Sequence, residues 1–121
     1  MKSVLFGILM GVALFTPAYA DGFGGKYKVE GTNINGTTYQ GEATITITSD
    51  TTCEIKWVTG KDNATADGIC MRNDDSFAAG YQLDGEVGLI IYKVMADGTL
   101  NGLWTIAGNG GNGTEILTPI K

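Results

Sequence analysis

The chain has 121 residues, a length that fits one domain. It carries 8 basic and 13 acidic residues, giving a formal net charge of -5, and it contains 19 glycines, 2 prolines and no histidine. The charged fraction of 17% excludes a disordered acidic tail and a coiled coil, and the lack of a basic face argues against a nucleic-acid partner.

The first twenty residues have the pattern of a cleavable signal peptide. Lys2 gives a positive start, an apolar segment runs from Val4 to Phe15, and residues 18–20 read Ala-Tyr-Ala, as at a cleavage site. The apolar segment is about a dozen residues long, shorter than the ~20 residues that cross a bilayer. We therefore expect that the mature chain, residues 21–121, is exported to an oxidising compartment, is periplasmic or secreted, and keeps no stable membrane anchor.

After the signal, apolar residues recur with a period of two, which is typical of strands with one buried face. In residues 38–48, for example, Ala43 and Ile45 alternate with threonines. The pattern predicts about eight strands, at residues 26–31, 38–48, 52–59, 64–72, 76–81, 87–95, 99–107 and 114–118.

Short links rich in Asn, Asp and Gly join these strands and favour sequential antiparallel hairpins. We therefore expect a single all-β domain, an up-and-down meander that closes into a small β-barrel of the lipocalin or avidin size class. A two-sheet β-sandwich is the alternative, because both folds give the same alternation.

The first hairpin that can be aligned contains both cysteines of the chain. If residues 60–63 form a four-residue loop, Trp57 faces Ala66 and Cys53 faces Cys70. In an exported chain this pairing predicts a disulfide, which would stabilise the fold by roughly 3 kcal/mol. A metal-binding or reactive thiol pair is disfavoured, because the chain has no C-x-x-C spacing and no histidine.

A second hairpin is expected to turn at Asp97-Gly98, a dipeptide favoured in two-residue turns. That register places Ile91 opposite Trp104 on one face. The other face is also apolar, so it is either covered by another part of the chain or exposed; if exposed, it is our candidate partner-binding face, made of Ile90, Tyr92 and Leu103.

Catalysis is not expected. The absence of histidine excludes Ser-His-Asp and Cys-His nucleophilic sites, and acids such as Asp50, Asp62, Asp84 and Asp97 are explained by turn formation. We therefore predict that the protein is not an enzyme and has no catalytic residue, no cofactor and no bound metal.

Large aromatic residues either fill the core or line a pocket inside the barrel. The candidate interior pocket consists of Trp57, Trp104, Tyr39 and Arg72. Arg72 is the only arginine, and it would either orient an anionic group at the mouth of the barrel or form a local ion pair with Asp74 or Asp75.

One further pattern is spread over nearly the whole mature chain, in residues 27–33, 35–36, 39–41, 68–71, 87–92, 97–105 and 113–119. These segments resemble a group of small exported alphaproteobacterial proteins, some of which are labelled fibronectin-binding proteins. The resemblance implies an all-β fold and binding of a host protein, and it assigns no binding residue.

The leading functional expectation is therefore an exported, non-enzymatic binding module that recognises a protein, either a fibronectin-like host matrix protein or an envelope protein. Two alternatives remain: a carrier of a small apolar ligand inside the barrel, and an inhibitor of an exported enzyme.

Overall fold

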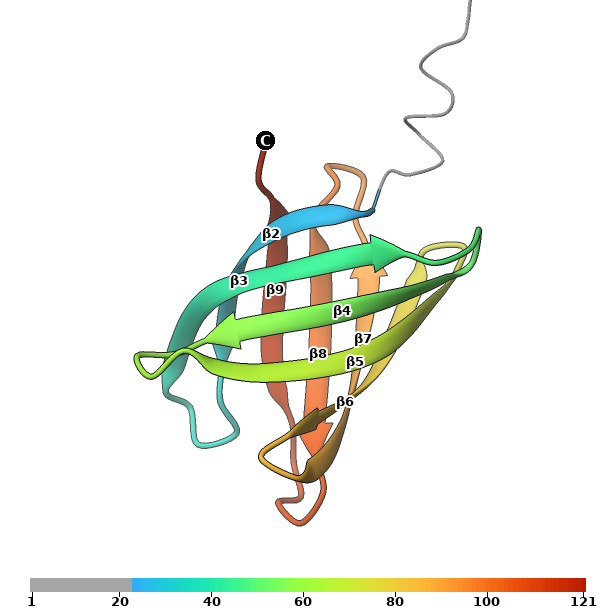
Figure 1. The fold of residues 1–121 in the computed structure, drawn as a ribbon. Coiled ribbons are helices and arrows are strands. Elements are labelled where there is room, and N and C mark those ends of the chain that lie inside the picture. The colour runs from blue at the N-terminus through green and yellow to red at the C-terminus, as the bar shows by residue number, and fades with distance from the viewer. Residues whose placement is uncertain (1–22) are drawn as a thin grey trace, which may run out of the picture.

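The computed structural model describes residues 23–121, in which eight antiparallel strands form a closed barrel (Figure 1). The predicted signal peptide and its cleavage site lie outside the described residues. The strands are β2 (Gly25–Thr32), β3 (Thr38–Ile47), β4 (Thr52–Thr59), β5 (Ala64–Asn73), β6 (Ser76–Leu83), β7 (Glu86–Val94), β8 (Leu100–Ile106) and β9 (Gly113–Pro119). Within this part of the chain, no helix is long and apolar enough to cross a membrane.

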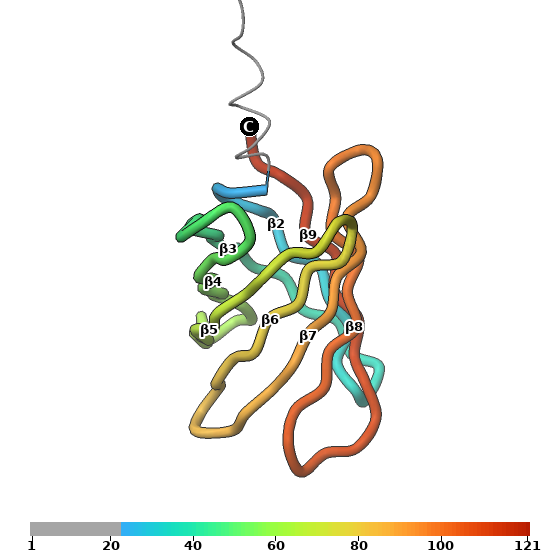
Figure 2. The backbone as a smooth tube through the Cα atoms, turned by 90° about the vertical axis from the view of Figure 1, so that its right-hand side faces the viewer, coloured from blue at the N-terminus to red at the C-terminus, as the bar shows by residue number. Residues whose placement is uncertain are grey.

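The barrel closes because the last strand pairs with the first. β9 lies antiparallel to β2, from Tyr27 opposite Pro119 to Thr32 opposite Thr114. Figure 2 shows β3, β4 and β5 on one side of the interior and β7 and β8 on the other. The predicted barrel is thus confirmed over the β-sandwich, and the buried residues of each strand alternate with exposed ones, as along β9, where Gly113, Glu115 and Leu117 are buried.

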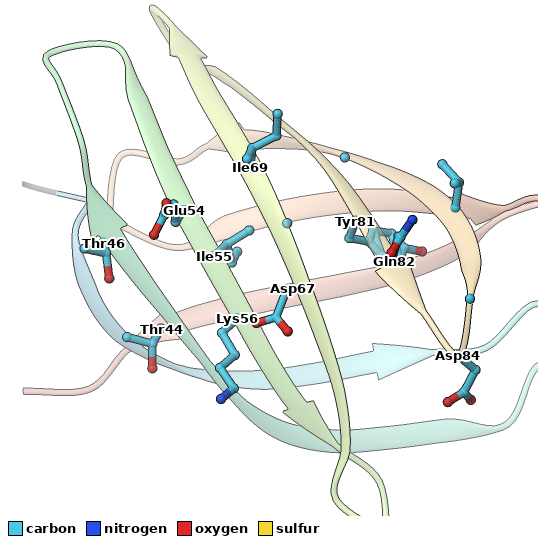
Figure 3. A pocket seen from close by; sticks show the side chains of 14 residues that line it. Thr44, Thr46, Glu54, Ile55, Lys56, Asp67, Ile69, Tyr81, Gln82 and Asp84 are labelled. Atoms are coloured by element: carbon cyan, nitrogen blue, oxygen red, sulfur yellow. The ribbon is translucent and has the colours of Figure 1, made fainter.

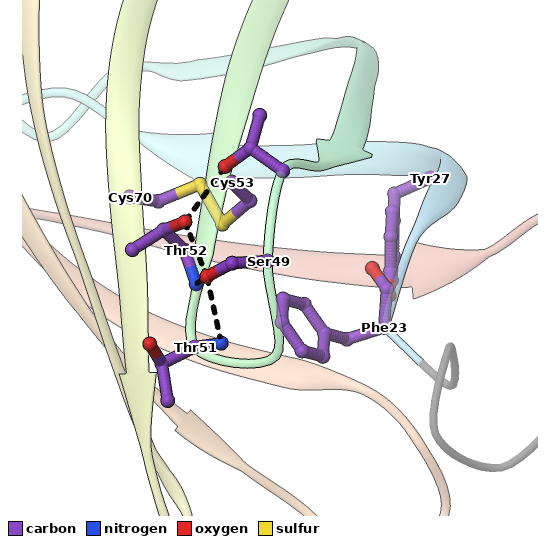
Figure 4. Close-up of a disulfide and its surroundings, with 8 residues drawn as sticks. Phe23, Tyr27, Ser49, Thr51, Thr52, Cys53 and Cys70 are labelled. Atoms are coloured by element: carbon purple, nitrogen blue, oxygen red, sulfur yellow. Dashed lines mark hydrogen bonds between the residues drawn. A yellow bond between two sulfur atoms is a disulfide. The ribbon is translucent and has the colours of Figure 1, made fainter.

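The register predicted for the first hairpin is confirmed. Trp57 lies opposite Ala66 and Cys53 opposite Cys70, across the four residues 60–63. The two cysteines form the predicted disulfide, with their Cα atoms 4.9 Å apart (Figure 4). Both are buried, so the covalent link joins β4 to β5 from inside the barrel.

The register predicted for the second hairpin is wrong by one residue. Trp104 lies opposite Ile90 instead of Ile91, because the loop contains three residues, 96–98. The amide of Gly98 donates to the Met95 carbonyl, and Gly98 has a φ of 89°, as in a type I turn closed by a left-handed glycine. A slip of one residue moves every side chain of a strand to the opposite face.

Aromatic rings in the barrel lie over glycines of neighbouring strands. A β-carbon at Gly31 would lie 2.1 Å from the Tyr39 ring, and one at Gly102 would lie 2.7 Å from the Tyr92 ring. The same arrangement recurs in the directly paired residues Tyr81 with Gly88 and Trp104 with Gly113. Each glycine therefore leaves room for a ring to cross its strand toward the next one.

One end of the barrel, here the disulfide end, contains Phe23 and the disulfide (Figure 4), together with Phe77, which packs on Phe23. The ring centroids of Phe23 and Phe77 are 5.4 Å apart, and the Tyr27 hydroxyl donates to the Phe23 carbonyl over 2.6 Å. All these side chains are buried, so the N-terminal segment covers this end with apolar surface.

Candidate functional site

The only charged side chain buried among the described residues is that of Glu115, in β9. Its two register partners are glycines, Gly31 on β2 and Gly102 on β8. Beyond those glycines lie Tyr39 on β3 and Tyr92 on β7, so one row across five strands reads Tyr39, Gly31, Glu115, Gly102, Tyr92. The glycines let both tyrosines reach the carboxylate from opposite sides.

Three side chains donate hydrogen bonds to Glu115. The Tyr39 hydroxyl donates to Oε1 over 2.6 Å, and Trp57 Nε1, from β4, donates to Oε2 over 3.0 Å. The Tyr92 hydroxyl also donates to Oε2. We call the part of the barrel that contains this cluster the Glu115 end.

No cation faces the carboxylate from the described residues. The one ion pair among them joins Lys28 to Glu30 on the outside of β2. Burial raises the pKa of Glu115 above its usual value of 4.5, and the three hydrogen bonds oppose that shift. A buried charge loses several kcal/mol of hydration, and hydrogen bonds to a charged group return about 1.5–3 kcal/mol each. The carboxylate is thus solvated by donors but not neutralised.

The tyrosines around Glu115 keep their protons at neutral pH. Burial and the nearby Glu115 raise the pKa of Tyr81 to about 12. The pKa values of Tyr39 and Tyr92 are raised by burial, by the charge of Glu115 and by their hydrogen bonds to it. All three phenols therefore remain neutral near the carboxylate.

A cavity of about 280 Å³ lies beside this cluster. Its aromatic and carboxylate lining is Tyr39, Trp57, Tyr81, Trp104 and Glu115, and the remaining lining is Asn33, Thr59, Gly60, Ala64, Ala66, Leu83 and Ile90. Gly60 and Ala64 are exposed at the ends of β4 and β5, so the cavity reaches solvent between the end loops.

The structure brings three of the four predicted pocket residues together. Trp57, Trp104 and Tyr39 all line the cavity, and the Tyr39 and Trp104 ring centroids are 6.4 Å apart. Arg72 lies elsewhere, at the disulfide end, where its guanidinium carbon is 5.1 Å from the centre of the Phe23 ring. Its Nε donates to the backbone carbonyl of Asp74 over 2.7 Å, so Arg72 covers the apolar end and does not face the cavity.

The predicted partner-binding face does not exist as one surface. Ile90 and Tyr92 are buried inside the barrel, and Leu103 is exposed, because the one-residue error in the hairpin register exchanged the two faces of β7. The outside carries a different apolar surface, here the aliphatic face, made of Ile69, Met71, Leu89, Ile91 and Leu103. These five side chains are each more than half exposed.

A larger hollow of about 1020 Å³ lies on the outer wall of β3 to β7 (Figure 3). Thr44, Glu54, Lys56 and Asp67 contribute to its lining, and all but the half-buried Thr44 are exposed. A solvated wall of mixed charge offers a ligand no enclosed contact surface. The interior cavity, which holds a buried charge, is the better candidate site.

Metal binding finds no support in residues 23–121, because no three acidic or cysteine side chains there converge on one point. The two cysteines are joined to each other. The interior cavity contains a single carboxylate, which is too few ligands for a typical protein metal site.

Glu115 is the site residue that the sequence reasoning missed. The signal was the period of two along β9, because an inward Leu117 requires an inward residue at position 115. An acid between buried Gly113 and Leu117 therefore indicated a buried charge. Its partners could not be found in this way, because they lie 76, 58 and 23 residues away along the chain.

No protein-family model matches this chain, and no curated protein matches it in sequence. Its fold is similar to that of designed β-barrels. A redesigned barrel, b11L5F_LGL, has a TM-score of 0.75 and 17% identity, over 84% of this chain and 95% of that one. The redesigned barrel mFAP1, solved bound to DFHBI, has a TM-score of 0.71 and 20% identity, over 83% of this chain and 97% of that one.

A de novo designed fluorescence-activating β-barrel is also similar, with a TM-score of 0.64 and 17% identity, over 84% of this chain and 96% of that one. At sequence identities of 17–20%, the similarity shows only that the strands of these proteins follow the same path. These comparisons therefore place the chain among small closed β-barrels and establish its fold alone.

Proposed function

We propose that this protein is an exported, non-enzymatic binding protein that holds a small ligand inside the barrel, at the Glu115 end. The observation that carries the proposal is the cavity of about 280 Å³ with a buried, unneutralised carboxylate in its wall. A cavity lined by aromatic rings with few converging polar groups is typical of small-molecule sites.

Energetics support a functional role for Glu115. A glutamate kept in the core without a counter-ion lowers stability compared with an apolar residue of similar size. Three separate strands supply donors that hold it in place, from Tyr39, Trp57 and Tyr92. Glu115 thus lowers stability and is still held in a fixed position beside an accessible cavity. This arrangement is expected of a preorganised binding site.

Designed barrels of the same fold give a precedent for ligand binding. The redesigned barrel mFAP1 was solved with DFHBI bound to it. A closed barrel of this size class can thus bind a ligand, which is the property that we propose for this chain.

Three probes of similar size and different charge test the proposal: benzylamine, benzyl alcohol and benzoate. Trp57 and Trp104, the only tryptophans in the chain, both line the cavity and report its occupancy by their fluorescence. We expect at least one probe to give a saturable change in fluorescence.

Two variants test whether the fluorescence change comes from binding inside the cavity. Ala66→Leu puts a larger side chain into the cavity and should abolish binding, whereas Thr65→Leu adds the same side chain at an exposed position of the same strand and should not. No response to any probe, or equal responses in both variants, would refute an interior ligand site.

Protein recognition is the second candidate function, and the aliphatic face favours it. In register, Ile69, Gly80 and Leu89 form one row, and Met71, Ala78, Ile91 and Leu103 form the next, so small residues of β6 lie between larger apolar ones. The five large side chains are each more than half exposed and adjoin one another in the sheet. A contiguous exposed apolar surface of this kind suits a partner protein with an aliphatic contact surface.

Fibronectin, named by the resemblance, is the partner to test by surface plasmon resonance. We expect Leu89→Asp, in the aliphatic face, to abolish binding, and Thr46→Asp, exposed on β3, to leave it unchanged. Absence of binding by the unaltered protein, or the same binding by Leu89→Asp, would refute this second function.

A further inference from the structure

We infer that the interior cavity selects a small organic cation of the quaternary ammonium class, with Glu115 as its counter-ion and four aromatic rings as its walls. The inference rests on the proposed function, because it names the ligand class of the same cavity.

Charge is the first argument. The donors at Glu115 are two hydroxyls and an indole N–H, which solvate an ionised carboxylate but bring no positive charge. The titratable groups that face it are Tyr39, Tyr81 and Tyr92, and all three are neutral phenols. From β2 and β8 only glycines adjoin it. A cationic ligand would supply the missing countercharge in a region of low dielectric, where an ion pair is strong.

The number of hydrogen bonds also leaves a place for a ligand. An ionised carboxylate offers about four acceptor positions, and the three donors occupy three of them. Oε2 accepts from Trp57 and Tyr92, whereas Oε1 accepts from Tyr39 alone. Oε1 is therefore the less solvated oxygen, and the positive charge of a quaternary ammonium, which has no N–H to donate, can approach it without displacing a donor.

The aromatic walls are the second argument. Trp57 and Tyr81 form one pair, with centroids 5.3 Å apart and planes at 59°, and Tyr39 and Trp104 form another, with centroids 6.4 Å apart and planes at 69°. All four rings line the cavity. Ring faces carry negative electrostatic potential and attract cations within about 6 Å.

Together, several aromatic rings and an acid recognise a charged group that is too bulky and too weakly hydrated to need many hydrogen bonds. A trimethylammonium group has those properties, and cages of aromatic residues are the known protein solution for binding it. An anionic ligand would instead be repelled by Glu115, and a neutral apolar ligand would leave the carboxylate without a countercharge.

The test compares choline with its neutral isostere, 3,3-dimethyl-1-butanol, by isothermal titration calorimetry. The two probes have nearly the same shape and differ in the charge of one central atom. We expect choline to bind the unaltered protein at least about tenfold more tightly than the alcohol, the size of effect given by a desolvated cation against aromatic faces. Tetramethylammonium, which lacks the hydroxyl, should show the same preference.

Two glutamate variants test whether Glu115 causes the preference for choline over the alcohol. In Glu115→Gln the amide keeps the shape and can donate to the Tyr39 oxygen, so the preference for choline should shrink severalfold, to what the aromatic faces alone give, while the affinity for the alcohol stays the same. The control Glu42→Gln removes an exposed charge on β3 and should leave the preference intact. The affinity for choline should also rise with pH as Glu115 ionises, whereas that for the alcohol should not.

The outcomes separate this inference from the proposed function. Equal binding of choline and the alcohol, or a preference that is undiminished in Glu115→Gln, would overturn the cation inference and leave an interior ligand site standing. Binding of benzyl alcohol or benzoate without any binding of choline or tetramethylammonium would do the same. If none of the probes binds, both proposals are wrong.

Discussion

The two ends of the barrel are built from the same strands and differ in what fills them. At the disulfide end, Phe23, Phe77 and the cysteines are buried in apolar contact, and Arg72 covers the Phe23 ring. At the Glu115 end, rings of similar size surround a charged group and a cavity. Aromatic residues therefore complete the core at one end and form a candidate binding site at the other.

This difference suggests that one end of the barrel mainly stabilises the fold, whereas the other end is arranged for binding. The disulfide end gains stability from apolar burial and a covalent link, both of which favour the folded state. The Glu115 end gives up some stability by burying a charge and by keeping a cavity among its side chains. Stabilising contacts at one end thus allow the other to keep an arrangement suited to binding.

The largest effect is expected for Phe77→Ala. Phe77 is fully buried, its ring is 5.4 Å from that of Phe23, and it stacks on Tyr92 with centroids also 5.4 Å apart. Truncating a buried phenylalanine costs about 3–5 kcal/mol. We expect a loss of that size in the free energy of unfolding, measured with a chemical denaturant. A loss below about 1 kcal/mol would show that the disulfide end is not the stabilising end.

Replacing both Cys53 and Cys70 with alanine should cost about 3 kcal/mol of unfolding free energy, because the unfolded chain loses a constraint over 17 residues. Affinity for cavity ligands should stay the same, since neither cysteine lines the cavity. The matched measurements are denaturation and probe binding on the same double variant. A change in affinity as large as the change in stability would contradict the separation of the two ends.

Gly102→Ala should affect both ends. Its new β-carbon would lie 2.7 Å from the Tyr92 ring, which packs on Phe77 and donates to Glu115. Overpacking of this kind costs about 1–3 kcal/mol, and displacement of the hydroxyl should also weaken ligand binding. Gly80→Ala is the control, because its β-carbon would meet only Leu89, at 3.8 Å. Equal stability of the two variants would refute the proposal that Gly102 leaves room for the Tyr92 ring.

The smallest expected effect is a pH dependence of the free energy of unfolding, caused by Glu115. Its pKa in the folded protein is raised above 4.5 by burial, so the folded state holds the proton more tightly than the unfolded state. The stabilising contribution is complete below pH 4.5 and is lost as the pH rises through the folded pKa. The unaltered protein should therefore lose stability relative to Glu115→Gln over that interval. If the free energies of unfolding of the two proteins changed with pH in the same way, a raised pKa of Glu115 would be contradicted.

Most of the barrel could be predicted because its signals are local. The period of two placed the strands, and a four-residue loop placed Cys53 opposite Cys70. The error in the second hairpin also arose locally, because Asp97-Gly98 fits both a two-residue turn and the last two positions of a three-residue loop. The one-residue difference then placed Ile90 and Tyr92 on the wrong face.

The candidate site was harder to predict because it depends on closure. Glu115 meets Tyr39 only through the pairing of β9 with β2, which joins the two ends of the chain. The position of Arg72, in contrast, could have been found from the first hairpin. It lies six residues beyond Ala66 on β5, and at ~3.4 Å per residue that is about 20 Å from the level of Trp57.

The most direct test is an NMR titration of the Glu115 side-chain carboxyl, with and without saturating choline. We expect a pKa above 4.5 in the free protein and a lower pKa with choline bound, because a cation that prefers the ionised carboxylate must in turn favour its ionisation. A pKa that choline leaves unchanged would contradict the assignment of Glu115 as the ligand's counter-ion.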